Sequence, residues 1–175
     1  METKPTVMNN MPDDTAQTRF QMLIEKHRGI VLKVAYSYCR HAADRDDLAQ
    51  EICAQLWKSF ARYDESRKFS TWMYRVALNV AISHVRRSEG RPRSVQSITG
   101  DDTQIAAPEA PDPDERITAL NLFIARLDPL NRALVLLYLE EHSYREIAEV
   151  LGITETNVAT KINRLKQRIR EELTL

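Results

Sequence analysis

The sequence predicts an all-α fold with two small helical domains joined by a flexible acidic linker. Only 4 of 175 residues are glycine, and no Asn-Gly or Asp-Gly hairpin signal or alternating apolar stretch suggests a sheet. The apolar residues, 43% of the chain, recur with helical spacing and suffice for two modest cores. Residues 88–115 are rich in proline and, from 100 onward, in acidic residues. We therefore expect a disordered tail (1–14), a first domain (15–90), a linker (91–115) and a second domain (116–175).

The stretch from Asp46 to Phe60 predicts an amphipathic helix in the first domain. Its buried side carries leucine, isoleucine and phenylalanine at helical spacing, whereas Asp46, Gln50 and Trp57 share the opposite side. An exposed tryptophan among small polar neighbours is typical of an anchor for a protein partner. The alternative is that a neighbouring helix covers Trp57.

The stretch from Phe69 to Arg87 predicts a second helix that is apolar almost all round and therefore central in its bundle. One polar ridge remains, formed by Arg75, Asn79, Ser83 and Arg86. Basic side chains interleaved with aromatic ones suit single-stranded DNA, because rings stack on unpaired bases while cations follow the backbone. The alternative is that these aromatic residues, Trp72 among them, belong to the core.

Local signals divide the second domain into helices. Asp128-Pro129 predicts a helix start, and that helix should end near Glu141. Ser143 and Glu146 form a capping box that opens a short helix, which Gly152 ends in a left-handed conformation. Thr154 is placed to cap a third helix with one buried stripe of Val158, Ile162, Leu165 and Ile169. Together these elements predict a helix-turn-helix.

The exposed face of that third helix is polar and basic. It carries side chains that can reach base edges, and its flanks carry others suited to phosphates. Residues 159–170 include five basic side chains and no acidic one. The alternative is an ordinary helical hairpin with a solvated basic face.

The chain contains 25 basic and 25 acidic residues, a balance that at first argues against a nucleic-acid partner. The charges are unevenly distributed, however. Residues 61–96 hold eight basic and three acidic residues, whereas residues 97–128 hold two and seven. The net charge of zero therefore hides one basic and one acidic block.

Other classes of protein find little support in the sequence. No apolar run is long enough to span a membrane and no secretory signal is visible, so we expect a cytoplasmic protein. Cys39 and Cys53 lack zinc-ligand spacing and are expected in helices. The four histidines are scattered and no Gly-rich phosphate loop occurs, so neither an enzyme, a metal site, a cofactor nor a small-molecule substrate is expected.

Three motifs make the chain similar to a known family. They are Asp46–Ile52 followed by Leu56-Trp57, Phe69–Ala81, and Tyr144–Ile153. In this order and separation, over about residues 18–175, they resemble the extracytoplasmic-function sigma factors of bacterial RNA polymerase. The resemblance implies two promoter-reading domains, sigma region 2 and sigma region 4, and regulation by an anti-sigma factor.

The resemblance also implies a role for each candidate residue. One helix docks on the clamp helices of the largest polymerase subunit, through Asp46, Asp47, Leu48, Gln50, Glu51, Ala54 and Trp57. The next helix and its preceding loop open the −10 element and hold a flipped base, through Arg67, Lys68, Phe69, Trp72, Tyr74, Arg75, Asn79, Ser83, Arg86 and Arg87. The helix-turn-helix reads the −35 duplex, through Glu155, Thr156, Asn157, Thr160, Lys161, Asn163, Arg164, Lys166 and Arg168.

The acidic linker would thread toward the polymerase active site, and in the free protein it could cover the basic surfaces. Two features depart from the family pattern: Ala159 stands where a basic residue is frequent, and Asp128-Pro129 replaces the usual Pro-Pro pair. A stand-alone helix-turn-helix regulator remains an alternative, but it would use only residues 128–170. It would leave the basic helix 69–87 and the Trp57 face without a role.

Overall fold

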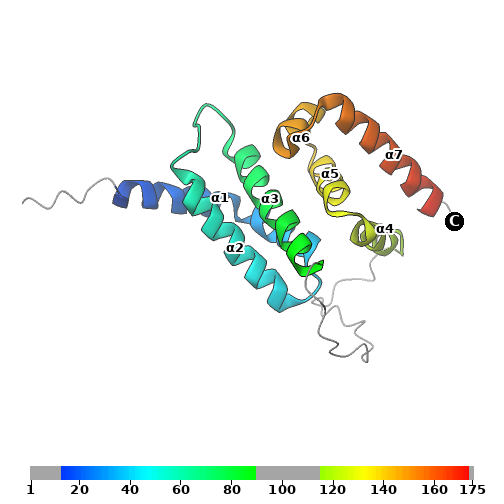
Figure 1. Cartoon of the computed structure of the whole chain (residues 1–175), viewed down its shortest axis with the longest axis horizontal. Helices are drawn as coiled ribbons and strands as arrows, with labels where there is room; N and C mark the ends of the chain where they lie inside the picture. The colour runs from blue at the N-terminus through cyan, green and yellow to red at the C-terminus, as the bar shows by residue number, and fades with distance from the viewer. Residues whose placement is uncertain (1–12, 90–114, 174–175) are drawn as a thin grey trace, which may run out of the picture.

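The computed structural model describes residues 13–89 and 115–173, and within those ranges it contains seven α-helices and no strand (Figure 1). The predicted all-α class is therefore confirmed. No helix in these two ranges is long and apolar enough to cross a membrane. The expected linker falls mostly on residues 90–114, which lie outside the described part of the chain, as does most of the expected tail.

The first domain is a bundle of three helices, α1 (Asp13–Tyr38), α2 (Ala42–Phe60) and α3 (Phe69–Glu89). Helix α1 begins inside the expected tail and departs from helical geometry at His27. The stripe Leu48, Ile52 and Leu56 of α2 is fully buried, as its spacing predicts. Cys53 lies in α2, but Cys39 follows the last residue of α1 rather than lying in a helix; both thiols are free.

The second domain contains α4 (Glu115–Arg126), α5 (Pro129–Leu139), α6 (Tyr144–Leu151) and α7 (Glu155–Leu173). The side chain of Asp128 caps α5 by accepting a hydrogen bond from the Asn131 amide (3.1 Å). Helix α5 ends two residues before the predicted Glu141, which itself adopts a left-handed conformation with φ of 60°. The chain reverses direction at Glu141, and the left-handed conformation there allows the His142 amide to donate a hydrogen bond to the Leu137 carbonyl (3.1 Å).

The helix-turn-helix formed by α6 and α7 is confirmed in its local details. Ser143 and Glu146 form a reciprocal capping box at the start of α6. Gly152 ends α6 with φ of 68°, and its next residue donates to the Ala148 carbonyl (3.2 Å). The Thr154 hydroxyl accepts a hydrogen bond from the Asn157 amide (3.2 Å), so it caps α7 as predicted.

The inner face of α7 anchors this helix to the second domain. Val158, Ile162 and Leu165 are buried, and Ile169 packs at the edge of the same stripe. Because these residues occupy one face, the polar residues between them must point away from the core. The predicted division of α7 into a buried and an exposed side is thus confirmed.

The two domains pack directly against each other. Helix α3 contacts α1 and α2 on one side and α5 and α6 on the other, while α7 lies on the outer side of the second domain (Figure 1). The buried residues of both domains form one continuous cluster. The predicted central position of α3 is confirmed. Its apolar surface extends over two sides because one side packs against α1 and α2 and the other packs against the second domain.

Candidate nucleic-acid interface

The predicted docking face lies on the exposed side of α2. Its exposed members are Asp46, Asp47, Gln50, Ala54 and Trp57. The indole ring of Trp57 rests against the Phe20 ring of α1, with the ring centres 5.1 Å apart, and remains 41% exposed. The neighbouring helix therefore supports Trp57 on one side without covering it.

Two further members of that predicted set do not lie on this open face. Leu48 is fully buried with Ile52 and Leu56, so direct contact of Leu48 with a partner is incompatible with this packing. Its apolar side chain supports the face from within. Glu51 is half-buried and turns toward α3 instead, where its carboxylate pairs with Arg87 and lies 3.3 Å from the Nδ1 atom of His84.

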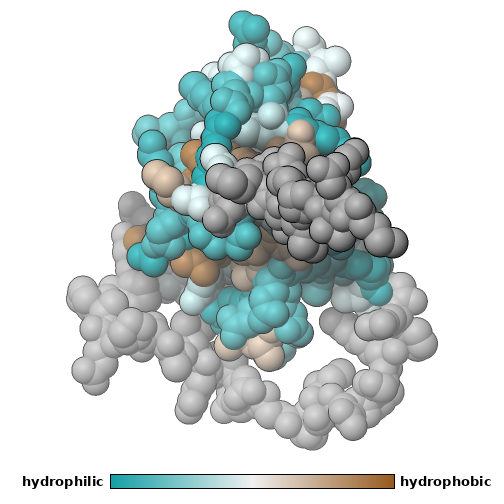
Figure 2. Space-filling view, turned by 90° about the vertical axis from the view of Figure 1, so that its left-hand side faces the viewer, coloured by the Kyte–Doolittle hydropathy of each residue, from teal (hydrophilic) through white to brown (hydrophobic). Residues whose placement is uncertain are grey.

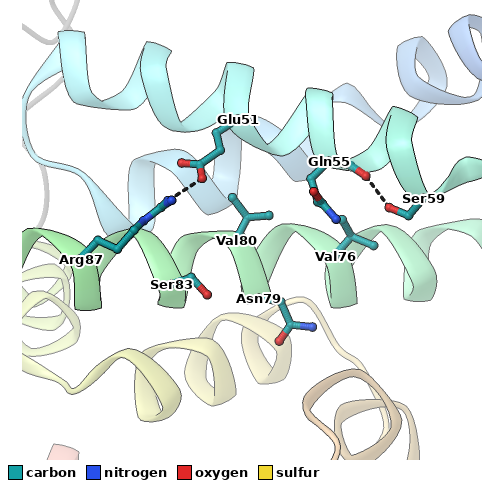
Figure 3. A pocket seen from close by; sticks show the side chains of 8 residues that line it. All are labelled: Glu51, Gln55, Ser59, Val76, Asn79, Val80, Ser83 and Arg87. Carbon is teal, nitrogen blue, oxygen red and sulfur yellow. Dashed lines mark hydrogen bonds and ion pairs between the residues drawn. The ribbon is translucent and has the colours of Figure 1, made fainter.

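A shallow groove of about 400 Å³ runs between α2 and α3 (Figure 3). Val76 and Val80 give it an apolar portion, and its polar lining comes from both helices: Glu51, Gln55, Ser59, Asn79, Ser83 and Arg87. An apolar surface edged by amide, hydroxyl and guanidinium groups matches the apolar faces and polar edge of a nucleobase. The hydrogen bond from Arg87 is the main cause that lowers the pKa of Glu51, so this carboxylate stays ionised beside the groove.

The predicted polar ridge of α3 is exposed at Arg75, Asn79, Ser83 and Arg86, whereas the guanidinium of the neighbouring Arg87 is paired with Glu51. At the start of α3 the aromatic rings form a packed cluster. Trp72 lies 5.1 Å from Tyr63 and 5.2 Å from Phe69, measured between ring centres. Phe69 is buried, so the core alternative holds for that ring, whereas Trp72 is only half-buried.

Tyr74 requires a correction, because its predicted role was to stack on an unpaired base. Its side chain is only 3% exposed and lies between the two domains. The ring packs edge-on against His142, 5.1 Å away, and the hydroxyl lies 3.4 Å from Oε2 of Glu140. The face of Tyr74 is therefore inaccessible to a base in this arrangement. Burial raises the pKa of Tyr74, with the Glu140 charge adding to the effect.

The two basic residues that precede α3 also face the second domain. The Arg67 guanidinium pairs with Glu149, and Nζ of Lys68 lies 2.9 Å from Oε1 of Glu146. The Lys68 contact is the largest cause lowering the pKa of Glu146 to about 2, with hydrogen bonds from Ser143 contributing next. Sequence reasoning missed these acidic partners on α6. The only signal available was that Glu146 and Glu149 oppose in sign the basic block 61–96.

On α7 the predicted reading residues divide into two groups. Those that project freely from the outer face are Glu155, Thr156, Asn157, Thr160, Asn163 and Arg164, with Lys161 half-buried beside them. Lys166 instead stands over the Tyr138 ring at 4.4 Å. Arg168 lies over the Phe123 ring at 5.4 Å and pairs with Glu172. These cation–π contacts hold α7 against α4 and α5, which reduces the reach of both cations toward DNA.

The described segments contain no group of three or more His, Cys, Asp or Glu residues that could hold an ion. The exposed side-chain chemistry of these segments lies on three surfaces. It comprises an exposed aromatic anchor on α2, a polar groove and ridge on α3, and an exposed polar face on α7.

Each of the two helical domains matches a family of known proteins. Residues 23–91 match the family Sigma-70 region 2, and residues 117–169 match Sigma-70, region 4. The ECF RNA polymerase sigma factor SigW of Bacillus subtilis (strain 168) is 27% identical, over 90% of each chain. The ECF RNA polymerase sigma factor SigE of Mycolicibacterium smegmatis is 30% identical, over 98% of this chain and 68% of that protein.

The fold also matches a solved structure of the sigma factor RpoE in complex with the anti-sigma factor NepR from Bartonella quintana. The TM-score is 0.63 at 15% identity, with 91% of this chain and 96% of that chain covered. The two family matches fall on the two helical domains described above, one on each side of residues 92–116. The chain belongs to the sigma-70 family, as an extracytoplasmic-function sigma factor of bacterial RNA polymerase.

Proposed function

We propose that this sigma factor docks on the clamp helices of core RNA polymerase through the exposed face of α2. It then reads the −10 element as single-stranded DNA with α3 and the −35 element as duplex with α7. The observation that carries the proposal is the presence of three distinct exposed recognition surfaces in one chain: the Trp57 face, the Asn79 groove and the outer face of α7.

The docking proposal is supported by the chemistry around Trp57. Its ring is held by Phe20 and partly exposed, so little side-chain freedom remains to be lost on binding. Asp46 and Gln50 extend the same face with polar groups that can pair at the rim of an interface. We assign Glu51 to the groove beside this face, because its carboxylate is paired with Arg87.

The −10 proposal is supported by the groove between α2 and α3. Asn79 lines the groove and is exposed, so its amide can both donate to and accept from a base edge. Arg75 and Arg86 lie along the same ridge and suit the phosphates of an unpaired strand. Trp72 is half-buried in the aromatic cluster and contacts Tyr63 of the preceding loop.

The −35 proposal is supported by the geometry of α7. Its capped N-terminal turn presents Thr156, Asn157 and Thr160 outward, as a recognition helix presents base-reading residues to the major groove. Arg164 and Lys161 continue this face with positive charge. A stand-alone regulator would need this element alone and is not favoured, because residues 23–91 also match Sigma-70 region 2.

Regulation and location follow from the family. The matched RpoE structure is a complex with an anti-sigma factor, and we propose that a protein of this kind also holds the present chain. We further propose that the chain acts in the cytoplasm, where its polymerase works, and that it catalyses no reaction of its own. Promoter opening would draw on binding energy to unpaired bases rather than on nucleotide hydrolysis.

The test is transcription in vitro with purified core polymerase and a genomic template library. The full chain should direct initiation at a small set of promoters that share −35 and −10 motifs. A chain carrying Asn79→Ala, Lys161→Ala and Arg164→Ala provides the control, since none of these three side chains is buried in a core. Initiation no higher than with core enzyme alone would refute the proposed function.

A further inference from the structure

Two basic residues at the end of the loop before α3 form ion pairs with two acidic residues of α6, the first helix of the helix-turn-helix. Arg67 pairs with Glu149, and Lys68 pairs with Glu146. The four side chains come from positions 78 and 82 residues apart, so these contacts tie the two domains together. The acidic residues lie one turn of α6 apart, and therefore present two carboxylates to two neighbouring cations.

Further contacts reinforce this arrangement deeper in the boundary between the domains. Lys33 of α1 pairs with Glu140 (2.5 Å), and the Tyr38 hydroxyl donates to the Pro129 carbonyl (2.6 Å). A guanidinium nitrogen of Arg132 donates to the Ser37 carbonyl (3.1 Å). Tyr74 is buried between the domains by the same closure. The charged pairs at the loop are thus the outer edge of a packed boundary.

We propose that Glu146 and Glu149 of α6 occupy the place of DNA phosphates on Arg67 and Lys68, so that the closed chain excludes the −10 strand. This inference rests on the proposed role of Arg67 and Lys68 in −10 binding. A cation paired with a carboxylate must give up that partner before it can neutralise a phosphate. Domain closure and −10 binding therefore compete for the same two side chains.

The competition is one-sided, because the other two recognition surfaces stay open in the closed chain. Trp57, Asp46 and Gln50 are exposed on α2, and the outer face of α7 is exposed from Glu155 to Arg164. Helix α7 lies on the side of the second domain away from α3 (Figure 1). The closed chain can accordingly meet polymerase and −35 duplex first, whereas Arg67 and Lys68 become available to the −10 strand only after the domains separate.

The face of the molecule shown in Figure 2 is mainly hydrophilic where it is coloured. The ion pairs at the loop are partly exposed, with side-chain exposures between 27% and 75%, so each is individually weak and screened by salt. Together the pairs Arg67–Glu149 and Lys68–Glu146 form an interdomain latch. This latch favours the closed arrangement of the two domains, and polymerase binding can break it.

A zero-length crosslink tests closure without any DNA. Carbodiimide joins an amine to a carboxylate only when they touch, so the monomeric chain should yield a Lys68–Glu146 amide, identified by peptide mass spectrometry. Lys68→Arg keeps the charge and removes the amine, and so serves as the specificity control. If the unmodified chain at low salt yields no Lys68–Glu146 crosslinked peptide, the proposal is overturned.

Binding of a labelled oligothymidine tests the competition between domain closure and single-strand binding. A length of about 15 nucleotides matches ordinary single-strand binding sites. The double variant E146Q/E149Q removes both carboxylates while glutamine still serves the capping box. Its affinity at low salt should rise about tenfold if about one molecule in ten of the unmodified chain is open. E25Q/E171Q is the matched control, because it makes the same charge change at two exposed carboxylates that pair with none of the proposed DNA-binding cations. Equal gains in both variants, or none in either, would overturn the proposal.

A third variant separates this failure from failure of the proposed function. Adding Arg67→Ala to E146Q/E149Q should return the oligothymidine affinity toward the starting value, because the freed cation is then absent. If Arg67→Ala has no effect in that background, Arg67 is not a −10 contact and the premise fails. If Arg67→Ala lowers affinity but E146Q/E149Q never raised it, the premise stands and the latch is refuted.

Discussion

The carboxylate of Glu51 in α2 is paired with the guanidinium of Arg87 in α3, beside a groove that Asn79 also lines. One helix of this pair carries the proposed polymerase-docking face and the other carries the proposed −10 ridge. The ion pair therefore joins two proposed recognition surfaces. It also explains why Glu51, which is close in sequence to Gln50, does not share its open position.

Replacement of Asn79 by alanine should impair promoter opening more than duplex binding. The side chain is exposed in the groove, so its loss removes a base contact with little effect on folding. Permanganate footprinting measures opening, and a gel shift with −35 duplex measures binding by α7. Ser88→Ala provides a control at the end of the same helix. Equal losses in the two assays would count against a single-strand role for the ridge.

Replacement of Trp57 by alanine should weaken binding to core polymerase by at least ~1 kcal/mol, a typical loss for an aromatic anchor. The indole also packs on Phe20, so folding must be checked separately by thermal unfolding. Lys58→Ala is the matched control, because Lys58 is exposed on the next position of α2. A folded Trp57→Ala chain with unchanged affinity in a pull-down would remove Trp57 from the interface.

Removal of the two cations Lys161 and Arg164 should lower −35 duplex affinity and flatten its salt dependence. Each phosphate contact contributes roughly 0.9 to the slope of log affinity against log salt, so the pair should reduce it by up to about 2. Arg126→Ala serves as control, because this exposed cation lies on α4. Titrations at several salt concentrations measure the slope. An unchanged slope would exclude both residues from the DNA backbone.

Acid should selectively weaken the contacts of Glu146. Its folded-state pKa is lowered to about 2 from a usual 4.5, mainly by Lys68 and then by Ser143. A lowered pKa stabilises the fold above the usual value, and that stabilisation is lost as the pH falls from about 4.5 toward about 2. The difference in unfolding free energy between the unmodified chain and Glu146→Gln should therefore shrink over this range. Urea unfolding at each pH measures it, and a constant difference would contradict the assignment.

The left-handed residues on either side of α6, Glu141 and Gly152, should both be more stable as glycine than as another residue. Gly152 has φ of 68° and open space around its Cβ position, so Gly152→Ala should cost only the left-handed strain, about 1 kcal/mol. Glu141 adopts the same conformation without being glycine, so Glu141→Gly should stabilise the fold by a similar amount. Thermal unfolding measures both. Gly29→Ala is a control inside α1, where a better helix former should stabilise.

How much of the site the sequence could predict depends on the distance between interacting residues. The helix-turn-helix followed from Ser143, Gly152 and Thr154, because capping and left-handed turns involve residues within a few positions of each other. The open ridge of Asn79 and the exposed Trp57 face also followed, since helical periodicity assigns each residue to a side.

The sequence by itself determined the all-α class, the helical character of both domains and the family. Only the tertiary structure decided that Tyr74 is buried between the domains, that Lys68 meets Glu146, and that Glu51 turns to Arg87. The physical reason is that periodicity shows which side of a helix is apolar but not which element covers it. Long-range pairing of charges leaves no periodic trace in the chain, so the closed arrangement of the two domains required the folded structure.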